Sequence, residues 1–130
     1  RAVYSKFFYG SKDIAVVKEN LKKLDLWEIK DKSISSLSIG QRQRVLLCRC
    51  LCVSEKIIFL DEPTNSLDIN VRKMLYDILE KLNKEGLTIV MISHDEEAFK
   101  YSNRALVLGK ENRVIENVLE KYEKGEINFD

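Results

Sequence analysis

This 130-residue sequence has almost no excess charge and no long apolar run. Its 22 basic and 21 acidic residues leave a net charge of +1, which gives no electrostatic reason to expect nucleic acid or an anionic membrane as a partner. No apolar run approaches the roughly 20 residues that cross a bilayer. The first residues, Arg1 to Tyr4, lead into mixed polar sequence rather than a signal peptide. We therefore expect a globular, cytoplasmic protein.

Cysteine is confined to one short segment, at Cys48, Cys50 and Cys52. Alternate positions on a helix point about 200° apart, so three thiolates there cannot converge on one metal ion. The pattern instead predicts small side chains packed in a helix, with reduced thiols.

The stretch from Lys56 to Pro63 runs through four consecutive large apolar residues into two carboxylates and a proline. An unbroken apolar run predicts a strand covered on both faces, as in a parallel sheet. Pro63 cannot donate to a ladder and ends the strand. Ligands bind beyond the carboxyl ends of such strands, where Asp61 and Glu62 fall. Taken alone, the stretch is equally compatible with a strand that ends in a solvated acidic turn.

The remaining periodicity predicts alternating helices and strands. Apolar residues at offsets of three and four predict a helix from Val71 to Leu82, ended by Gly86, and 87–92 reads as a second buried strand. Segments 105–108 and 113–115 read as a hairpin whose turn contains Gly109. The order of elements argues for an α/β fold with right-handed crossovers.

Further helices are expected near both ends and before the central strand. One is capped by Ser11, and one runs from Gln41 to about Val53. The expected buried positions are Ile14, Val17, Leu21 and Leu24 in the first helix and Val45, Leu46 and Leu51 in the second. A last helix is expected to bury Ile115, Val118, Leu119 and Tyr122.

Three motifs flank the central stretch at compatible spacing. Residues 37–45 (LSIGQRQRV) precede it, 64–68 (TNSLD) follow it directly, and 92–95 (ISHD) come later. In this order they resemble the signature motif, Walker B strand, D-loop and switch histidine of ATP-binding cassette (ABC) ATPases. The resemblance extends from about Lys12 to Asn117.

The resemblance implies a P-loop NTPase-like α/β fold, a mostly parallel sheet flanked by helices with part of the family's helical lobe. It divides the chain into a partial helical lobe, an ABC ATPase core portion and a C-terminal helix and tail, at 1–36, 37–117 and 118–130. The family's phosphate-binding loop, G-x-x-x-x-G-K-[ST] or Walker A, is absent, because none of the five glycines has a second glycine five residues on. We therefore expect a partial domain that needs its missing N-terminal half, or self-association, to fold fully.

ATP and Mg²⁺ are the ligands that the resemblance implies. Asp61 would hold Mg²⁺ or its water shell, and Glu62 would polarise the attacking water. His94, the only histidine, would contact and sense the γ-phosphate.

The signature and D-loop residues are implied to face a nucleotide held by a partner subunit, so that ATP lies between two copies. These residues are Ser38, Gly40, Gln41 and Asp68. Ile39 stands where the family commonly has glycine, and its β-branch restricts the backbone beside the phosphate. The plainer alternative, that Ser38 and Asp68 cap helices, stays open.

As a whole, the resemblance predicts the C-terminal part of the ATP-binding subunit of an ABC transporter, on the inner face of the cell membrane. Its partners would be the transmembrane subunits and either a second copy or another ATP-binding subunit. The chain alone is predicted to be inactive. Two alternatives are a soluble ABC-type ATPase acting in translation and a degenerate, non-enzymatic interaction module. Residues 96–98 and 103–108 favour the transporter, and intact Glu62 and His94 disfavour the module.

Overall fold

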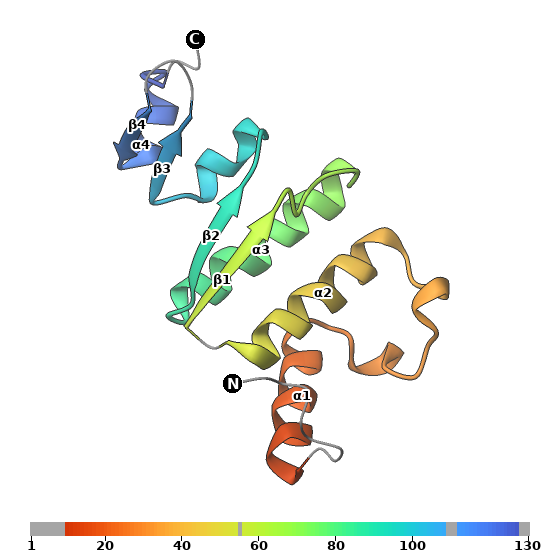
Figure 1. Ribbon diagram of the computed structural model, residues 1–130. Helices are drawn as coiled ribbons and strands as arrows, with labels where there is room; N and C mark the ends of the chain where they lie inside the picture. The colour runs from red at the N-terminus through yellow and green to blue at the C-terminus, as the bar shows by residue number, and fades with distance from the viewer. Residues whose placement is uncertain (1–9, 55, 109–111, 128–130) are drawn as a thin grey trace.

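A computed structural model describes residues 10–54, 56–108 and 112–127 of the chain (Figure 1). The helices are α1 (Ser11–Lys23), α2 (Ile39–Val53), α3 (Ile69–Lys84) and α4 (Val118–Glu123), and the strands are β1 (Ile57–Asp61), β2 (Thr88–Ile92), β3 (Arg104–Val107) and β4 (Arg113–Glu116). Short 3₁₀ turns lie at η2 (Trp27–Ile29), η3 (Ile34–Ser36) and η4 (Glu96–Tyr101). Two parts of the predicted organisation, the segment before residue 10 and the hairpin turn at Gly109, lie outside the described residues.

Strands β1 and β2 pair in parallel, and α3 forms the crossover between them. The register runs from Ile57 opposite Thr88 to Asp61 opposite Ile92. Gly86, with φ +103°, lets the chain leave α3 and enter β2, as its position after the apolar pattern predicts. The α/β class is thus confirmed, and the two strands end side by side.

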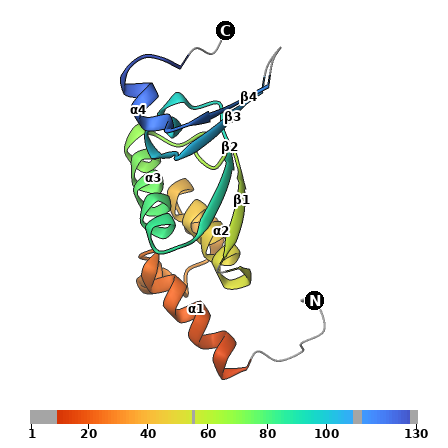
Figure 2. The same ribbon diagram turned by 90° about the vertical axis from the view of Figure 1, so that its left-hand side faces the viewer.

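The sheet is covered on one face only, so the prediction of strands buried on both faces is wrong for this structure. Figure 2 shows α2 and α3 on the same side of β1 and β2. Ile58, facing these helices, is 4% exposed, whereas Phe59 on the opposite face is 71% exposed. The open face carries Ile57, Phe59, Val90 and Ile92. An apolar run of this kind suits a strand with helices on both sides, and no described helix of this chain covers the second side.

The predicted hairpin is confirmed as β3 and β4, which pair antiparallel from Arg104 opposite Glu116 to Val107 opposite Arg113. It forms a sheet of its own rather than a third parallel strand beside β2. Helix α4 follows β4 and packs near η4, where the rings of Phe99 and Tyr122 stack 6.0 Å apart. Ile115 belongs to β4 and not to the last helix, because the backbone becomes helical only at Val118.

The core lies where α1, α2 and α3 meet the inner face of the sheet. Its fully buried members include Leu24, Leu26 and Tyr76. Two predicted buried positions of α1 are wrong: Ile14 and Val17 are exposed, because α1 joins the core only at its C-terminal end, through Leu21 and Leu24. Its N-cap is Gly10 rather than Ser11, which is the first helical residue.

Helix α2 is rotated from its predicted orientation. Leu46 is 50% exposed, whereas Leu47, Cys48 and Leu51 are buried. Positions 47 and 51 are one turn apart and set the inward face, so Leu46, about 100° away, points outward. Burial, with Cys52 beside it, raises the pKa of the Cys48 thiol to about 12, which fits a packing residue.

None of the described helices is long and apolar enough to cross a bilayer. Within the same residues, no group of three or more His, Cys, Asp or Glu side chains could hold a metal ion.

Helices α2 and α3 are in contact where both begin. Gly40, buried in the first turn of α2, lies against the side chain of Val71 in the first turn of α3. A Cβ atom on Gly40 would lie 2.5 Å from Cγ1 of Val71, closer than carbon atoms can approach. Glycine at this position therefore sets the distance between the two helix starts.

We predict that Gly40→Ala lowers the free energy of unfolding by about 1–3 kcal/mol, because overpacking forces the helices apart. Urea unfolding followed by circular dichroism measures this. Combining it with Val71→Ala should restore part of the loss. The matched control is Gly40→Ala in the Val71→Ala background, where the clashing Cγ1 atom is absent. An equal loss in both backgrounds would contradict the packing argument.

Candidate functional site

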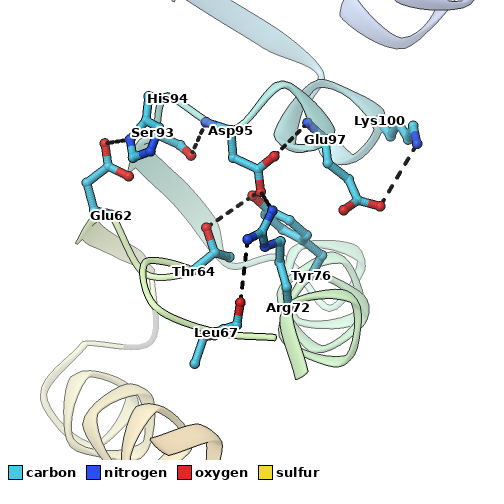
Figure 3. A network of polar contacts seen from close by, with 10 residues as sticks. All are labelled: Glu62, Thr64, Leu67, Arg72, Tyr76, Ser93, His94, Asp95, Glu97 and Lys100. Carbon is cyan, nitrogen blue, oxygen red and sulfur yellow. Dashed lines mark hydrogen bonds and ion pairs between the residues drawn. The ribbon is translucent and has the colours of Figure 1, made fainter. Parts of the chain in front are cut away.

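Glu62 and His94 meet at the carboxyl edge of the parallel sheet (Figure 3). His94 Nδ1 lies 2.8 Å from Glu62 Oε1. The strand register accounts for this: Asp61 is opposite Ile92, and the backbone N–H of Glu62 still donates to the carbonyl of Ile92, at 3.0 Å. Glu62 is the first residue after β1 and His94 the second after β2, so both side chains lie at the same edge of the sheet.

The backbone of Glu62 is in the left-handed region, with φ +45°. A non-glycine residue rarely adopts this conformation, and such positions concentrate at functional sites. The turn takes Glu62 out of the line of β1 and toward His94. The side chain of His94 is largely exposed to solvent, at 79%.

The chemistry of the pair fixes which ring nitrogen bears a proton. An ionised carboxylate can only accept, so Nδ1–H of His94 must donate to Glu62. The second nitrogen, Nε2, is left to meet another group. This arrangement places a carboxylate beside an imidazole whose Nε2 is available for a ligand.

A cleft of about 370 Å³ opens beside this pair. Its lining residues are Glu62, Thr64, Asn65, Ser66, Arg72, His94, Asp95 and Glu96. All come from the segments that follow β1 and β2 and from the first turn of α3. Ser66, like Glu62, has a left-handed backbone, with φ +62°, so the segment between β1 and α3 turns sharply twice beside the cleft.

Asp61 ends β1 at the same edge. Its side chain is exposed, and no hydrogen bond or ion pair within the described part of the chain engages its carboxylate. Carboxylate oxygens open to solvent are the ligands that Mg²⁺ takes in small number while it keeps its own waters. The residue type and its setting therefore fit the expected magnesium ligand.

The four remaining predicted site residues lie at the starts of α2 and α3, and none of them lines the cleft. Ser38 Oγ accepts from Gln41 N at 3.2 Å, and Ser38 N donates to Gln41 Oε1 at 3.0 Å, which forms a capping box. Asp68 Oδ1 accepts from the backbone of Asn70 and Val71 and caps α3. Gly40 contacts Val71. The helix-cap alternative therefore holds for Ser38 and Asp68 in this structure, and both helix starts lie together.

A polar network that joins the buried Tyr76 to residues lining the cleft was not predicted from the sequence (Figure 3). Tyr76 is fully buried, and its hydroxyl donates to Asp95 Oδ2 at 2.9 Å. Thr64 Oγ1 lies 3.4 Å from the same hydroxyl, and Arg72 Nη1 lies 3.3 Å from Asp95 Oδ2. Thr64 and Asp95 lie in two of the motifs described above, but the motifs do not indicate that they share a partner. Tyr76 lies outside the apolar pattern by which α3 was predicted.

The buried phenol makes the stability of the protein sensitive to alkaline pH. Burial, with the hydrogen bond to Asp95 adding to it, raises the pKa of Tyr76 from its ordinary value of 10.0 to about 12. Between these two values the unfolded chain loses the proton that the folded chain keeps. The stabilisation is therefore complete below about pH 10 and is lost as the pH rises toward about 12.

We predict that Tyr76→Phe makes the fall in unfolding free energy between pH 10 and 12 shallower than in the wild type, because phenylalanine has no proton to lose. Urea unfolding at pH 9, 10 and 11 measures this slope. Parallel pH profiles for the two proteins would contradict the assignment. Tyr101, whose pKa burial also raises, should account for part of the slope that remains.

Comparison with known sequences identifies proteins that this chain resembles. Residues 4–65 match the profile of the family described as ABC transporter. The manganese transport system ATP-binding protein MntB of Halalkalibacterium halodurans is 36% identical over 103 residues, which cover 78% of this chain and 41% of that protein. The Fe(3+) ions import ATP-binding protein FbpC of Escherichia coli is 39% identical over 98 residues, covering 74% and 28%. The chain thus spans less than half the length of these relatives.

Solved structures show the same fold. An inward-facing metal-chelate type ABC transporter matches with a TM-score of 0.78 and 29% identity, covering 88% of this chain and 47% of that one. The protein cbiO1 of Clostridium perfringens, part of the ABC transporter complex cbiONQ, matches with a TM-score of 0.76 and 28% identity, covering 93% and 50%. The chain is thus a partial domain of the ABC transporter family.

Proposed function

We propose that this chain supplies the hydrolytic edge of an ABC transporter's ATP-binding subunit, with Glu62 and His94 as its catalytic residues. The observation that carries the proposal is the 2.8 Å contact between His94 Nδ1 and Glu62 Oε1 at the ends of two parallel strands. Ligands of open α/β sheets bind at this edge. The similarity to ABC transporter ATP-binding proteins gives the edge its substrate, ATP.

Glu62 is the residue suited to position and polarise water. Its carboxylate is partly exposed beside the cleft, and His94 occupies Oε1, which leaves Oε2 to accept from a water molecule. Phosphoryl transfer depends mainly on such positioning and on stabilising charge. The left-handed backbone at Glu62 directs the carboxylate away from the strand and into the cleft.

His94 is suited to sense the terminal phosphate. With Nδ1 committed to Glu62, Nε2 can donate to a phosphate oxygen when the ring is protonated. Asp61 is the proposed Mg²⁺ ligand, and the bound ion would offset charge on the phosphate oxygens. The Glu62–His94 contact thus links the group that positions water with the group that meets the phosphate.

The starts of α2 and α3 are proposed to face the nucleotide of a second ATP-binding subunit. Ser38, Gly40 and Gln41 stand at a helix N-terminus, where backbone N–H groups and the helix dipole favour an anion. Asp68 caps the neighbouring helix, and the Gly40–Val71 contact keeps both starts together. Ile39, 48% exposed in this turn, presents a branched apolar side chain where the family commonly has glycine.

The remainder of the domain is the proposed partner for the open face of β1 and β2. Ile57, Phe59, Val90 and Ile92 leave a contiguous apolar strip in water, and strips of this kind mark surfaces that bind another protein element. The relatives are at least twice as long as the part that this chain matches. A segment that covers the face and carries the phosphate-binding loop would complete the domain, which would then dock on transmembrane subunits at the cytoplasmic side of the membrane.

The test is ATP hydrolysis by the complete cassette that contains this chain, measured beside its Glu62→Gln variant. We expect Glu62→Gln to lower kcat about 100-fold or more while ATP binding persists, because the amide cannot act as a base and still fits the site. His94→Ala should also lower kcat.

The isolated 130-residue chain is the second arm of this experiment, and we expect no turnover from it, with or without Glu62. Turnover that Glu62→Gln leaves unchanged in the complete cassette would refute the catalytic assignment. Turnover by the isolated chain would refute the proposed need for a separate phosphate-binding segment.

A further inference from the structure

Two loops must keep their positions for Glu62 and His94 to meet, and the pair has little support of its own. His94 is largely exposed, and within the described part of the chain its side chain makes a single hydrogen bond, to Glu62. Its placement therefore depends on the residues on either side of it. The same holds for Glu62, which stands in a strained turn between β1 and Pro63.

Asp95 fixes the loop that carries His94. Its backbone N–H donates to Ser93 Oγ at 3.0 Å, which ties together the two neighbours of the histidine. Its Oδ1 accepts from the N–H of Glu97 and caps η4. Its Oδ2 points down toward α3 and receives both Tyr76 and Arg72 (Figure 3). Both carboxylate oxygens are thus engaged.

Thr64 and Leu67 fix the loop that carries Glu62, and the same two residues of α3 hold them. Thr64, only two positions after Glu62, is buried with Oγ1 3.4 Å from the hydroxyl of Tyr76. The Leu67 carbonyl accepts from Arg72 Nη2 at 3.4 Å. Arg72 and Tyr76 are four residues apart, so they lie on one face of α3 beneath both loops.

The directions of the hydrogen bonds follow from the chemistry. Ionised Asp95 can only accept, so the Tyr76 hydroxyl donates to it. The phenol oxygen is then the acceptor for the Thr64 hydroxyl. Hydrogen bonds therefore run in one direction, from Thr64 in the Glu62 loop to Tyr76 and from Tyr76 to Asp95 in the His94 loop. Linked hydrogen bonds of this kind in a buried setting strengthen one another.

We propose that Tyr76 is a positioning residue for the hydrolysis proposed above: by bonding Thr64 and Asp95 together, it holds His94 in register with Glu62. Arg72 supports the same two loops from the preceding turn. Tyr76 lies beneath the cleft rather than in its lining, so it acts through the loops and not on the nucleotide.

Tyr76→Phe tests this, because it removes the hydroxyl and keeps the ring that stacks on Tyr101 at 4.8 Å. In the complete cassette we expect kcat to fall about tenfold, the worth of a well-placed hydrogen bond, with KM for ATP within about twofold of wild type. A structural defect would instead lower the active fraction and the unfolding midpoint. Thr64→Val removes the hydroxyl that donates to Tyr76. It should lower kcat by a smaller factor and likewise leave KM for ATP nearly unchanged.

Histidine-selective ¹⁵N NMR supplies a readout that does not depend on turnover. The ring signal that disappears in His94→Asn belongs to His94, and we expect Tyr76→Phe to shift or broaden it. Tyr101→Phe is the matched control, since that hydroxyl contacts Asp77, at 3.5 Å, and not the loops. It should leave both kcat and the His94 signal unchanged.

An unchanged His94 signal in Tyr76→Phe would overturn the proposal, whether or not kcat falls. A changed signal with wild-type kcat would also overturn it, because the position would then not matter to the reaction. Should Glu62→Gln fail to lower turnover, the proposed function fails, and the His94 signal still decides whether Tyr76 positions the loop.

Discussion

The parallel pairing of β1 with β2 is the constraint on which the rest of this structure depends. Because Asp61 lies opposite Ile92, the residues that follow each strand leave the sheet at one edge. Shifting the register by one residue would exchange the two faces of a strand and separate Glu62 from His94. The core on the inner face, with Ile58 against the buried residues of α2 and α3, holds that register in place.

The two faces of the same sheet differ in how they are covered. Its inner face is packed, whereas its outer face exposes Phe59 and Ile92. A two-stranded sheet covered on one side has few means to resist fraying, and parallel strands are found almost only in sheets covered on both sides. This asymmetry agrees with a chain that matches about half of the solved domains to which it is similar. We propose that other parts of the cassette complete the scaffold on which the site stands.

Much of the candidate site could be predicted from the sequence, because it lies at strand ends. Apolar runs followed by Asp61-Glu62 and by His94 suffice to place three side chains at one edge of a parallel sheet. Tyr76 could not be predicted in this way. A tyrosine in an amphipathic helix carries no sign of which residues its hydroxyl meets, since Thr64 and Asp95 approach it only through the tertiary fold.

The errors in the predicted fold also arise because tertiary packing is not specified by the local sequence pattern. The orientation of α2 depends on a shift of one residue, from Leu46 to Leu47, that a run of apolar residues and cysteines does not specify. Cover on both faces of β1 and β2 was predicted from their composition, and the described helices lie on one face only. An apolar run is typical of a strand with two covering layers, but it does not show whether one chain supplies both.

We propose that the Glu62–His94 pair at this edge acts on the terminal phosphate of ATP. A crystal structure of the complete cassette with Mg²⁺ and a non-hydrolysable ATP analogue is the decisive test. We expect an ordered water between the Glu62 carboxylate and the γ-phosphoryl group, with His94 Nε2 within hydrogen-bond distance of a γ-phosphate oxygen. An analogue bound with its γ-phosphate out of reach of both side chains would contradict the claim.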